Sequence, residues 1–162
     1  MMEYQHMDID NRTDLIDFII DENRLHSISE NILTHYFDTI PELSLSFITP
    51  REIQELNKTY RGYDEVTDVL TFPSDGEVDP ETGKEYLGDI LICVSRASEQ
   101  AASSNHPLQN EIELLLIHGL LHLLGYDHSD ESQKEEMWAL QNEYLDLFNI
   151  NLGRKPGEDL GY

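Results

Sequence analysis

Three histidines in the C-terminal half of the chain have the spacing of a metal site. His118 and His122 stand four residues apart in the run IHGLLHLLGYDH, and His128 follows Gly125. On a helix, residues four apart project from one face, so both imidazoles can reach one ion. Gly125 is expected to end that helix in a left-handed turn that brings His128 to the same ion. The pattern predicts one divalent cation, with zinc as the expected metal.

The donor types favour a catalytic cation over a structural one. Three histidines leave a fourth position for water, whereas structural zinc sites use four protein ligands, usually including cysteines. The chain has a single cysteine, Cys93, in an apolar run that predicts inert packing. The alternative is that two core histidines and a loop histidine share this spacing by accident. Burial argues against it, because an unpaired buried imidazole costs about 1–3 kcal/mol. The remaining histidines have polar neighbours and are predicted to lie at the surface: His6, His26, His35 and His106.

The ligand spacing alone also matches a class of metalloprotease. The metzincins share the pattern H-x3-H-x5-H, but they carry a glutamate directly after the first histidine as the general base. Gly119 takes that position here. A metzincin-like protease without its glutamate base therefore stays open only as an alternative.

The periodicity of the chain predicts the elements that must position these residues. Apolar residues at helical spacing, with the capping box Ser27–Glu30, predict a helix over 28–40 that Pro41 stops. The other expected elements are strands at 5–10, 43–47, 66–72 and 87–94, and helices at 50–62, 107–125 and 130–148, with a polar connection over 73–85. The fold class predicted is α+β: one small mixed sheet of about four strands with about five helices. The metal site is placed on a central helix and the turn after it.

Length and charge limit the remaining possibilities. The 162 residues fit one domain over 1–152, followed by a flexible tail over 153–162. No apolar run is long enough for a membrane span and no secretion signal is recognisable, so a cytoplasmic protein is expected. The formal net charge of -23 repels nucleic acid, although half of the basic residues fall between positions 51 and 96 and could form a local positive patch.

The histidine run HGLLHLLGYDH resembles the signature of the YbeY family of bacterial metal-dependent endoribonucleases. Three further segments are similar to the family pattern in the same order: LNKTYR (56–61), TDVLTFP (67–73) and LGDI (87–90). Thr71 stands where the family often has serine. The resemblance covers about residues 5 to 150. It implies a small sheet with helices around a three-histidine metal site, formed by His118, His122 and His128.

The resemblance also implies an activity and partners. The activity is the cleavage of single-stranded RNA in ribosomal RNA maturation and 30S/70S ribosome quality control, with Arg61 and His118 as catalytic residues. A ribosomal RNA precursor is the implied substrate. Ribosomal small-subunit proteins or an assembly GTPase remain open as partners, and neither DNA nor a membrane is implied. An arginine can bind a phosphate through two parallel hydrogen bonds. The sequence alone favours a surface salt bridge of Arg61 with Asp64 or Glu65, and the family resemblance reverses this preference.

Two aspartates have two interpretations each. Asp127 and Asp68 could orient ligand histidines, or they could cap a helix and a turn. Trp138 and Tyr144 are interpreted as core residues. A non-catalytic ribosome-assembly factor with a structural metal is the second functional hypothesis, because an acidic surface suits basic ribosomal proteins.

Overall fold

A computed structural model describes residues 5–15 and 17–153 of the chain. Its sheet has four strands in the spatial order β1-β2-β4-β3. They are β1 (Met7–Asn11), β2 (Glu42–Ile48), β3 (Val69–Pro73) and β4 (Tyr86–Cys93). β1, β2 and β4 run parallel, whereas β3 pairs antiparallel with β4 and lies at the edge of the sheet. The predicted mixed sheet of four strands in an α+β fold is confirmed.

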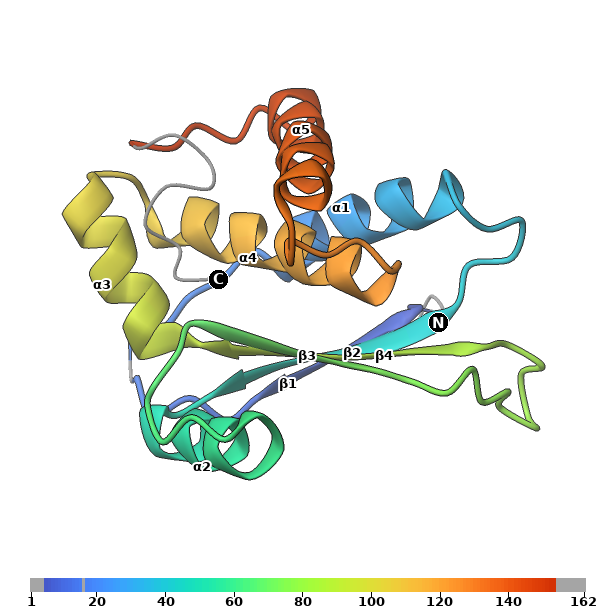
Figure 1. The fold of residues 1–162 in the computed structure, drawn as a ribbon, viewed down its shortest axis with the longest axis horizontal. Coiled ribbons are helices and arrows are strands. Elements are labelled where there is room, and N and C mark those ends of the chain that lie inside the picture. Colours follow the sequence, from blue (N-terminus) through green and yellow to red (C-terminus); the bar gives the residue numbers. More distant parts are fainter. Residues whose placement is uncertain (1–4, 16, 154–162) are drawn as a thin grey trace.

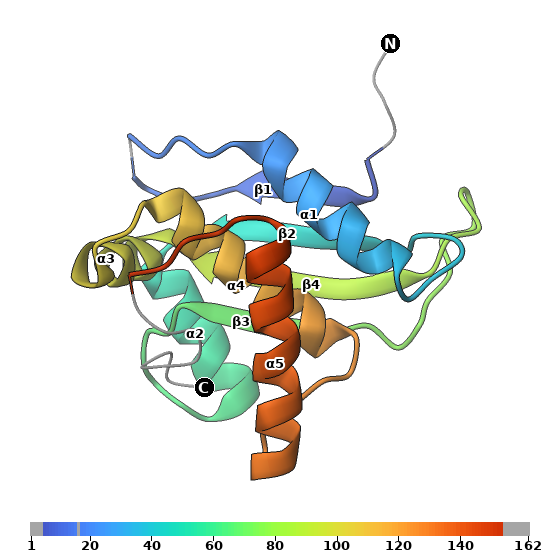
Figure 2. The ribbon, with the colours of Figure 1, turned by 90° about the horizontal axis from the view of Figure 1, so that it is seen from above.

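Five helices occur in the described ranges, on both faces of the sheet. They are α1 (Glu22–Thr34), α2 (Pro50–Arg61), α3 (Val94–Ser104), α4 (Leu108–Leu123) and α5 (Glu131–Leu147). α2 lies alone below the sheet in Figure 1, whereas α1 and α4 cover the upper face and α5 lies above α4. Figure 2 shows the same layers from above, with α5 crossing over α4. α4 is therefore sandwiched between the sheet and α5.

The two faces of the sheet have separate apolar cores. The larger core joins the upper helices to the sheet, and α4 contributes an almost unbroken run of buried residues to it. The smaller core lies between the sheet and α2 and consists of Ile48, Ile53, Leu70, Leu91 and Cys93. A helix buried on all sides needs apolar residues all round. This explains why the run around the two helical histidines lacks a polar face.

The predicted start and end of the first helix are wrong. α1 begins at Glu22 and ends at Thr34, and its N-cap is Asp21, whose carboxylate accepts a hydrogen bond from the Arg24 N–H at 3.1 Å. Ser27 lies exposed inside the helix. An N-cap carboxylate satisfies a backbone N–H of the first turn. Asp21 caps the helix more than one turn before Ser27, where the predicted capping box begins.

The prediction missed α3 entirely. This helix follows β4 without a connecting loop, and Cys93 is both the last residue of the strand and the N-cap of the helix. No side chain caps it. A helix that starts without a capping residue, a glycine or a proline leaves no start signal in the sequence.

The remaining helices begin close to where they were predicted. α2 starts at Pro50 with Thr49 as N-cap and ends at Gly62, α4 starts after Pro107, and Asp130 caps α5. In the described part of the chain, no helix combines the length and apolarity that crossing a membrane requires. The predicted flexible tail over 153–162 lies outside the described residues, except for Gly153.

Candidate metal centre

α4 places His118 and His122 one turn apart with their imidazoles in contact. Their Nε2 atoms are 3.0 Å apart, and their ring centroids are separated by 4.6 Å. His118 is 1% exposed, whereas His122 is half-buried. The two side chains therefore present their ring nitrogens to one common point at the end of the buried helix.

The turn after α4 brings the third histidine to that point. Gly125 has a left-handed φ of +103°, and its N–H donates to the His122 carbonyl at 3.0 Å. The His128 ring centroid then lies 5.0 Å from that of His122 and 5.9 Å from that of His118. One nitrogen from each histidine lies within 4.8 Å of the others. The three predicted ligands therefore come together in the geometry of a candidate metal site.

Hydrogen bonds fix which nitrogens face the common point. Nδ1–H of His122 donates to the Tyr126 carbonyl at 3.1 Å, and Nδ1–H of His118 donates to Oε1 of Gln141 at 3.0 Å. A neutral imidazole has one N–H and one lone pair, so both Nε2 atoms direct lone pairs toward each other. A cation between them removes that repulsion. The donor set thus fits a divalent metal.

Burial also keeps these imidazoles neutral. It lowers the pKa of His118 well below the usual histidine value, with the neighbouring His122 lowering it further. The pKa of His122 is lowered as well, first by burial and then by the charge of His128. A metal ligand must be unprotonated, so these shifts keep the nitrogens available for a cation.

α5 supports the site from above with two residues that the sequence analysis did not assign to it. Gln141 is fully buried and holds the His118 ring through Nδ1. Trp138, one turn earlier, lies with its ring centroid 5.6 Å from His118 and 5.9 Å from His128. Their three-residue spacing puts them on one face of α5, but it does not by itself indicate that this face meets the histidines. Trp138 forms a wall of the site and is only partly buried.

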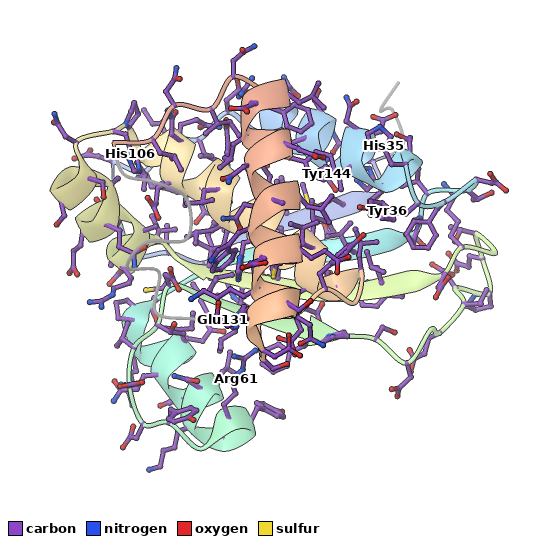
Figure 3. All side chains as sticks on the ribbon, turned by 45° about the horizontal axis from the view of Figure 1, so that its top comes forward. His35, Tyr36, Arg61, His106, Glu131 and Tyr144 are labelled. Atoms are coloured by element: carbon purple, nitrogen blue, oxygen red, sulfur yellow. The ribbon has the colours of Figure 1, made fainter. Side chains whose placement is uncertain are left out.

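A tyrosine pair attaches the ligand-bearing turn to the end of α1. The hydroxyls of Tyr36 and Tyr126 lie 3.3 Å apart, and the two rings meet edge to face. Figure 3 shows Tyr36 near His35 and Tyr144. The Tyr144 hydroxyl lies 3.2 Å from Nδ1 of His35. The turn that carries His128 is thereby attached to the segment that follows α1, and His35 in that segment contacts α5.

A cavity of about 330 Å³ opens beside the three histidines. Val69, Thr71 and Pro73 of β3 line one side, the turn residues Gly125, Tyr126 and Asp127 line another, and Arg61 completes it. Arg61 is the last residue of α2 and is labelled in Figure 3 below the start of α5. Two other basic residues of α2 form ion pairs, Lys58 with Asp64 and Arg51 with Glu55. Arg61 thus lines the same cavity as the three histidines.

The two aspartates that were candidates for orienting ligand histidines have different surroundings. Asp127 accepts hydrogen bonds from the His128 N–H and the Ser129 hydroxyl, which lower the pKa of its carboxyl. It therefore shapes the turn. Asp68 is buried beside Gln100. With the Gln100 amide turned so that its nitrogen faces the carboxylates, this nitrogen donates to Asp68 and to Glu111. Burial raises the pKa of Asp68 to about 6.

Two of the four histidines predicted at the surface have buried side chains. His6 is 8% exposed, and its Nε2 lies 2.8 Å from the Ser29 hydroxyl. The His106 side chain is 3% exposed and its Nε2–H donates to Glu111 at 2.7 Å. Both have a polar partner from elsewhere in the chain, so polar sequence neighbours did not indicate exposure. His35 is exposed as predicted.

Comparison with known proteins gives consistent matches over most of the chain. The family model described as Endoribonuclease YbeY matches residues 8–149. The chain is 39% identical to Endoribonuclease YbeY of Clostridioides difficile over 148 residues, which cover 88% of this chain and 95% of the relative. It is 47% identical to the protein of that name from Macrococcus caseolyticus, over 70% of this chain and 75% of the relative. The solution structure of TM1509 from Thermotoga maritima is similar with a TM-score of 0.58, 27% identity and 88% coverage of each chain.

Proposed function

The chain belongs to the endoribonuclease YbeY family, and we propose that it is a metal-dependent endoribonuclease that cleaves single-stranded RNA in ribosomal RNA maturation and ribosome quality control. One observation carries the proposal beyond the family name. Arg61 and the three histidines line one cavity. A cavity that combines a cation site with a guanidinium is suited to a phosphodiester, because both groups offset its negative charge.

His118, His122 and His128 would hold one divalent cation, and zinc is the metal we expect for a site of three imidazoles. When bound, such a cation lowers the pKa of coordinated water and neutralises charge on the phosphodiester. The chain's own part is to fix the ligand nitrogens. Gln141 and the Tyr126 carbonyl hold the rings of His118 and His122, so that Nε2 of each faces the cavity.

Arg61 supplies the second positive group. A guanidinium can bind two phosphate oxygens through parallel hydrogen bonds, which fixes the phosphate in orientation as well as in place. We assign to Arg61 the role of holding the scissile phosphate against the histidine cluster. We assign His118 as the catalytic histidine of this proposal, because it is the most buried of the ligands and Gln141 holds its ring.

Packing around Gly119 disfavours the protease alternative. A Cβ at this position would lie 2.9 Å from Cγ2 of Ile90, closer than side chains normally approach. A glutamate could occupy this position only if the Ile90 side chain or α4 itself moved. Position 119 therefore faces the sheet, and the chain offers no room there for the general base that metzincins use.

The activity is tested with zinc-loaded protein and a fluorescently labelled single-stranded RNA. We expect cleavage by the wild type, none by His118→Ala or His122→Ala, and a decrease of about 10²–10³-fold for Arg61→Ala. Arg51→Ala is the matched control, since Arg51 lies on the same helix and its side chain is 90% exposed. Cleavage that persists in both histidine variants would reveal a contaminating nuclease and refute the proposal.

The same variants separate the enzyme from a non-catalytic assembly factor. If the metal only secures the fold, Arg61→Ala leaves ribosome maturation intact while ligand variants unfold. A folded ligand variant that has lost the maturation function favours the enzyme. Hydrolysis of casein that a chelator abolishes would instead support the protease.

A further inference from the structure

Tyr60 is an aromatic residue that the fold leaves largely exposed. It lies on α2 directly before Arg61 and continues the apolar stripe that Ile53 and Leu56 direct toward the sheet. Ile53 is fully buried, yet Tyr60 is 66% exposed. The difference arises because Tyr60 meets the edge strand β3, beyond which the described residues provide no further strand.

The ring of Tyr60 is nevertheless held in place. It meets the ring of Phe72 edge to face, with centroids 5.2 Å apart and planes at 70°. Phe72 is partly buried against the smaller core. An aromatic ring fixed in this way has little rotational freedom left to lose when a ligand covers its open surface.

The position of Phe72 relates Tyr60 to the cavity. Side chains alternate across a strand, and the residues on either side of Phe72, Thr71 and Pro73, line the cavity. Phe72 itself faces α2. The cavity and Tyr60 therefore lie on the two sides of one edge strand, with Arg61 reaching the cavity from the α2 side.

Only certain ligands can contact both places. A ligand held at Arg61 and Tyr60 must bend around the edge of β3 and present a flat surface to the tyrosine. An unpaired stretch of RNA can do this, because its backbone is flexible and its bases are free to stack on aromatic side chains. In a duplex the base faces are already stacked on one another.

Charge gives a second reason for a stacking contact. The chain carries a formal net charge of -23, so long-range electrostatics work against RNA binding. Base stacking does not depend on net charge and tolerates any base sequence. An acidic RNA-binding protein therefore needs contacts of this kind more than a basic one does.

We propose that Tyr60 is a stacking site for an unpaired RNA base next to the phosphate held by Arg61. The inference rests on the proposed function, because it takes the phosphate to lie in the cavity. It assigns the recognition of unpaired RNA to one residue outside the metal site. The ring contact with Phe72 and the exposure of Tyr60 at the edge of β3 are the observations that support it.

The test measures binding separately from cleavage. The zinc-loaded protein is titrated into a single-stranded 2′-O-methyl oligoribonucleotide that contains 2-aminopurine, whose fluorescence falls when the base stacks. We expect Tyr60→Ala to weaken binding by about 5-fold to 150-fold and to lose the quenching. Tyr60→Phe and Tyr60→Trp retain both, and a duplex of the same sequence binds weakly to every variant. Leu147→Ala, at another exposed apolar residue, is the control.

The outcomes distinguish this inference from the proposed function. A wild type that binds and quenches but does not cleave RNA would remove the proposed activity and leave the stacking site in place. A folded Tyr60→Ala variant that binds within twofold of the wild type would overturn the stacking site, whether or not RNA is cleaved. A wild type that does not bind the unpaired probe would also overturn it, and would leave Tyr60 as a candidate contact for a protein.

Discussion

Gln141 of α5 accepts a hydrogen bond from Nδ1 of His118, 23 positions earlier in the sequence, and both side chains are buried. This bond selects the tautomer of the candidate ligand. Partners of this kind fix the orientation of a ligand ring, and their loss typically lowers metal affinity 10-fold to 100-fold. The site therefore depends on α5 as well as on α4.

Gln141→Leu is expected to weaken zinc binding by about 10-fold to 100-fold while the chain stays folded. The leucine side chain cannot accept a hydrogen bond from Nδ1–H, so the His118 ring loses its fixed orientation. Competition with a chromophoric chelator measures the affinity. Asn142→Leu is the matched control, because the adjacent Asn142 is exposed. Equal affinities for Gln141→Leu and the wild type would contradict this role.

Trp138 is expected to report metal binding directly. It is the single tryptophan of the chain, and its ring lies beside two of the candidate ligands. Addition of Co²⁺, a paramagnetic substitute for zinc, should quench its fluorescence until one equivalent has been added, and a chelator should restore it. In His128→Ala the quenching should require a large excess of metal. Quenching that does not saturate near one equivalent in the wild type would count against a single site.

Asp68→Asn is expected to remove a pH dependence of stability. The folded-state pKa of Asp68, about 6, is above the ordinary value of 3.8, so the native state binds the proton more tightly than the unfolded chain. Its favourable contribution is therefore complete below about pH 4 and is lost as the pH rises through 6. The variant should be more stable than the wild type at pH 8, by on the order of 2–3 kcal/mol at most.

Urea unfolding at pH 4.5 and pH 8 measures this effect. Asp146→Asn provides the baseline, because Asp146 is exposed on α5. If Asp68→Asn shows the same difference between the two pH values as the wild type, the burial of Asp68 does not set this pH dependence.

Gly119→Ala is expected to destabilise the protein by about 1–3 kcal/mol. In an ordinary helix the same change stabilises by close to 1 kcal/mol, so the sign is informative. The added methyl group would lie 2.9 Å from Cγ2 and 3.0 Å from Cδ1 of Ile90. Thermal unfolding measures the change, and the double variant Gly119→Ala with Ile90→Ala should recover part of the loss. An increase in stability for the single variant would show that α4 does not press against β4 here.

The candidate ligands could be predicted from the sequence because they are close together in it. The spacing of His118 and His122, and the glycine before His128, are local signals with a direct geometric meaning. Gln141 and Trp138 are far from the ligands in sequence, and nothing in α5 indicates which of its faces meets α4. Arg61 was placed at the site through the family resemblance, since a single exposed arginine has many ordinary uses.

The fold could be predicted where an element has marked ends. Pro50 and Gly62 bound α2, and Asp130 starts α5. α3 has no such start because β4 passes straight into it. Burial of His6 and His106 depended on Ser29 and Glu111, partners that only the tertiary structure brings close.

The short segment that carries the three histidines has a consequence for folding. His118 to His128 span only eleven residues, and closing so small a loop costs little conformational entropy. The unfolded chain can therefore also gather these imidazoles around a cation, without the support of Gln141 or Trp138. A cation that binds both states shifts the folding equilibrium by less than its native affinity implies. Excess zinc should therefore raise the melting temperature less than the tightness of the native site would suggest.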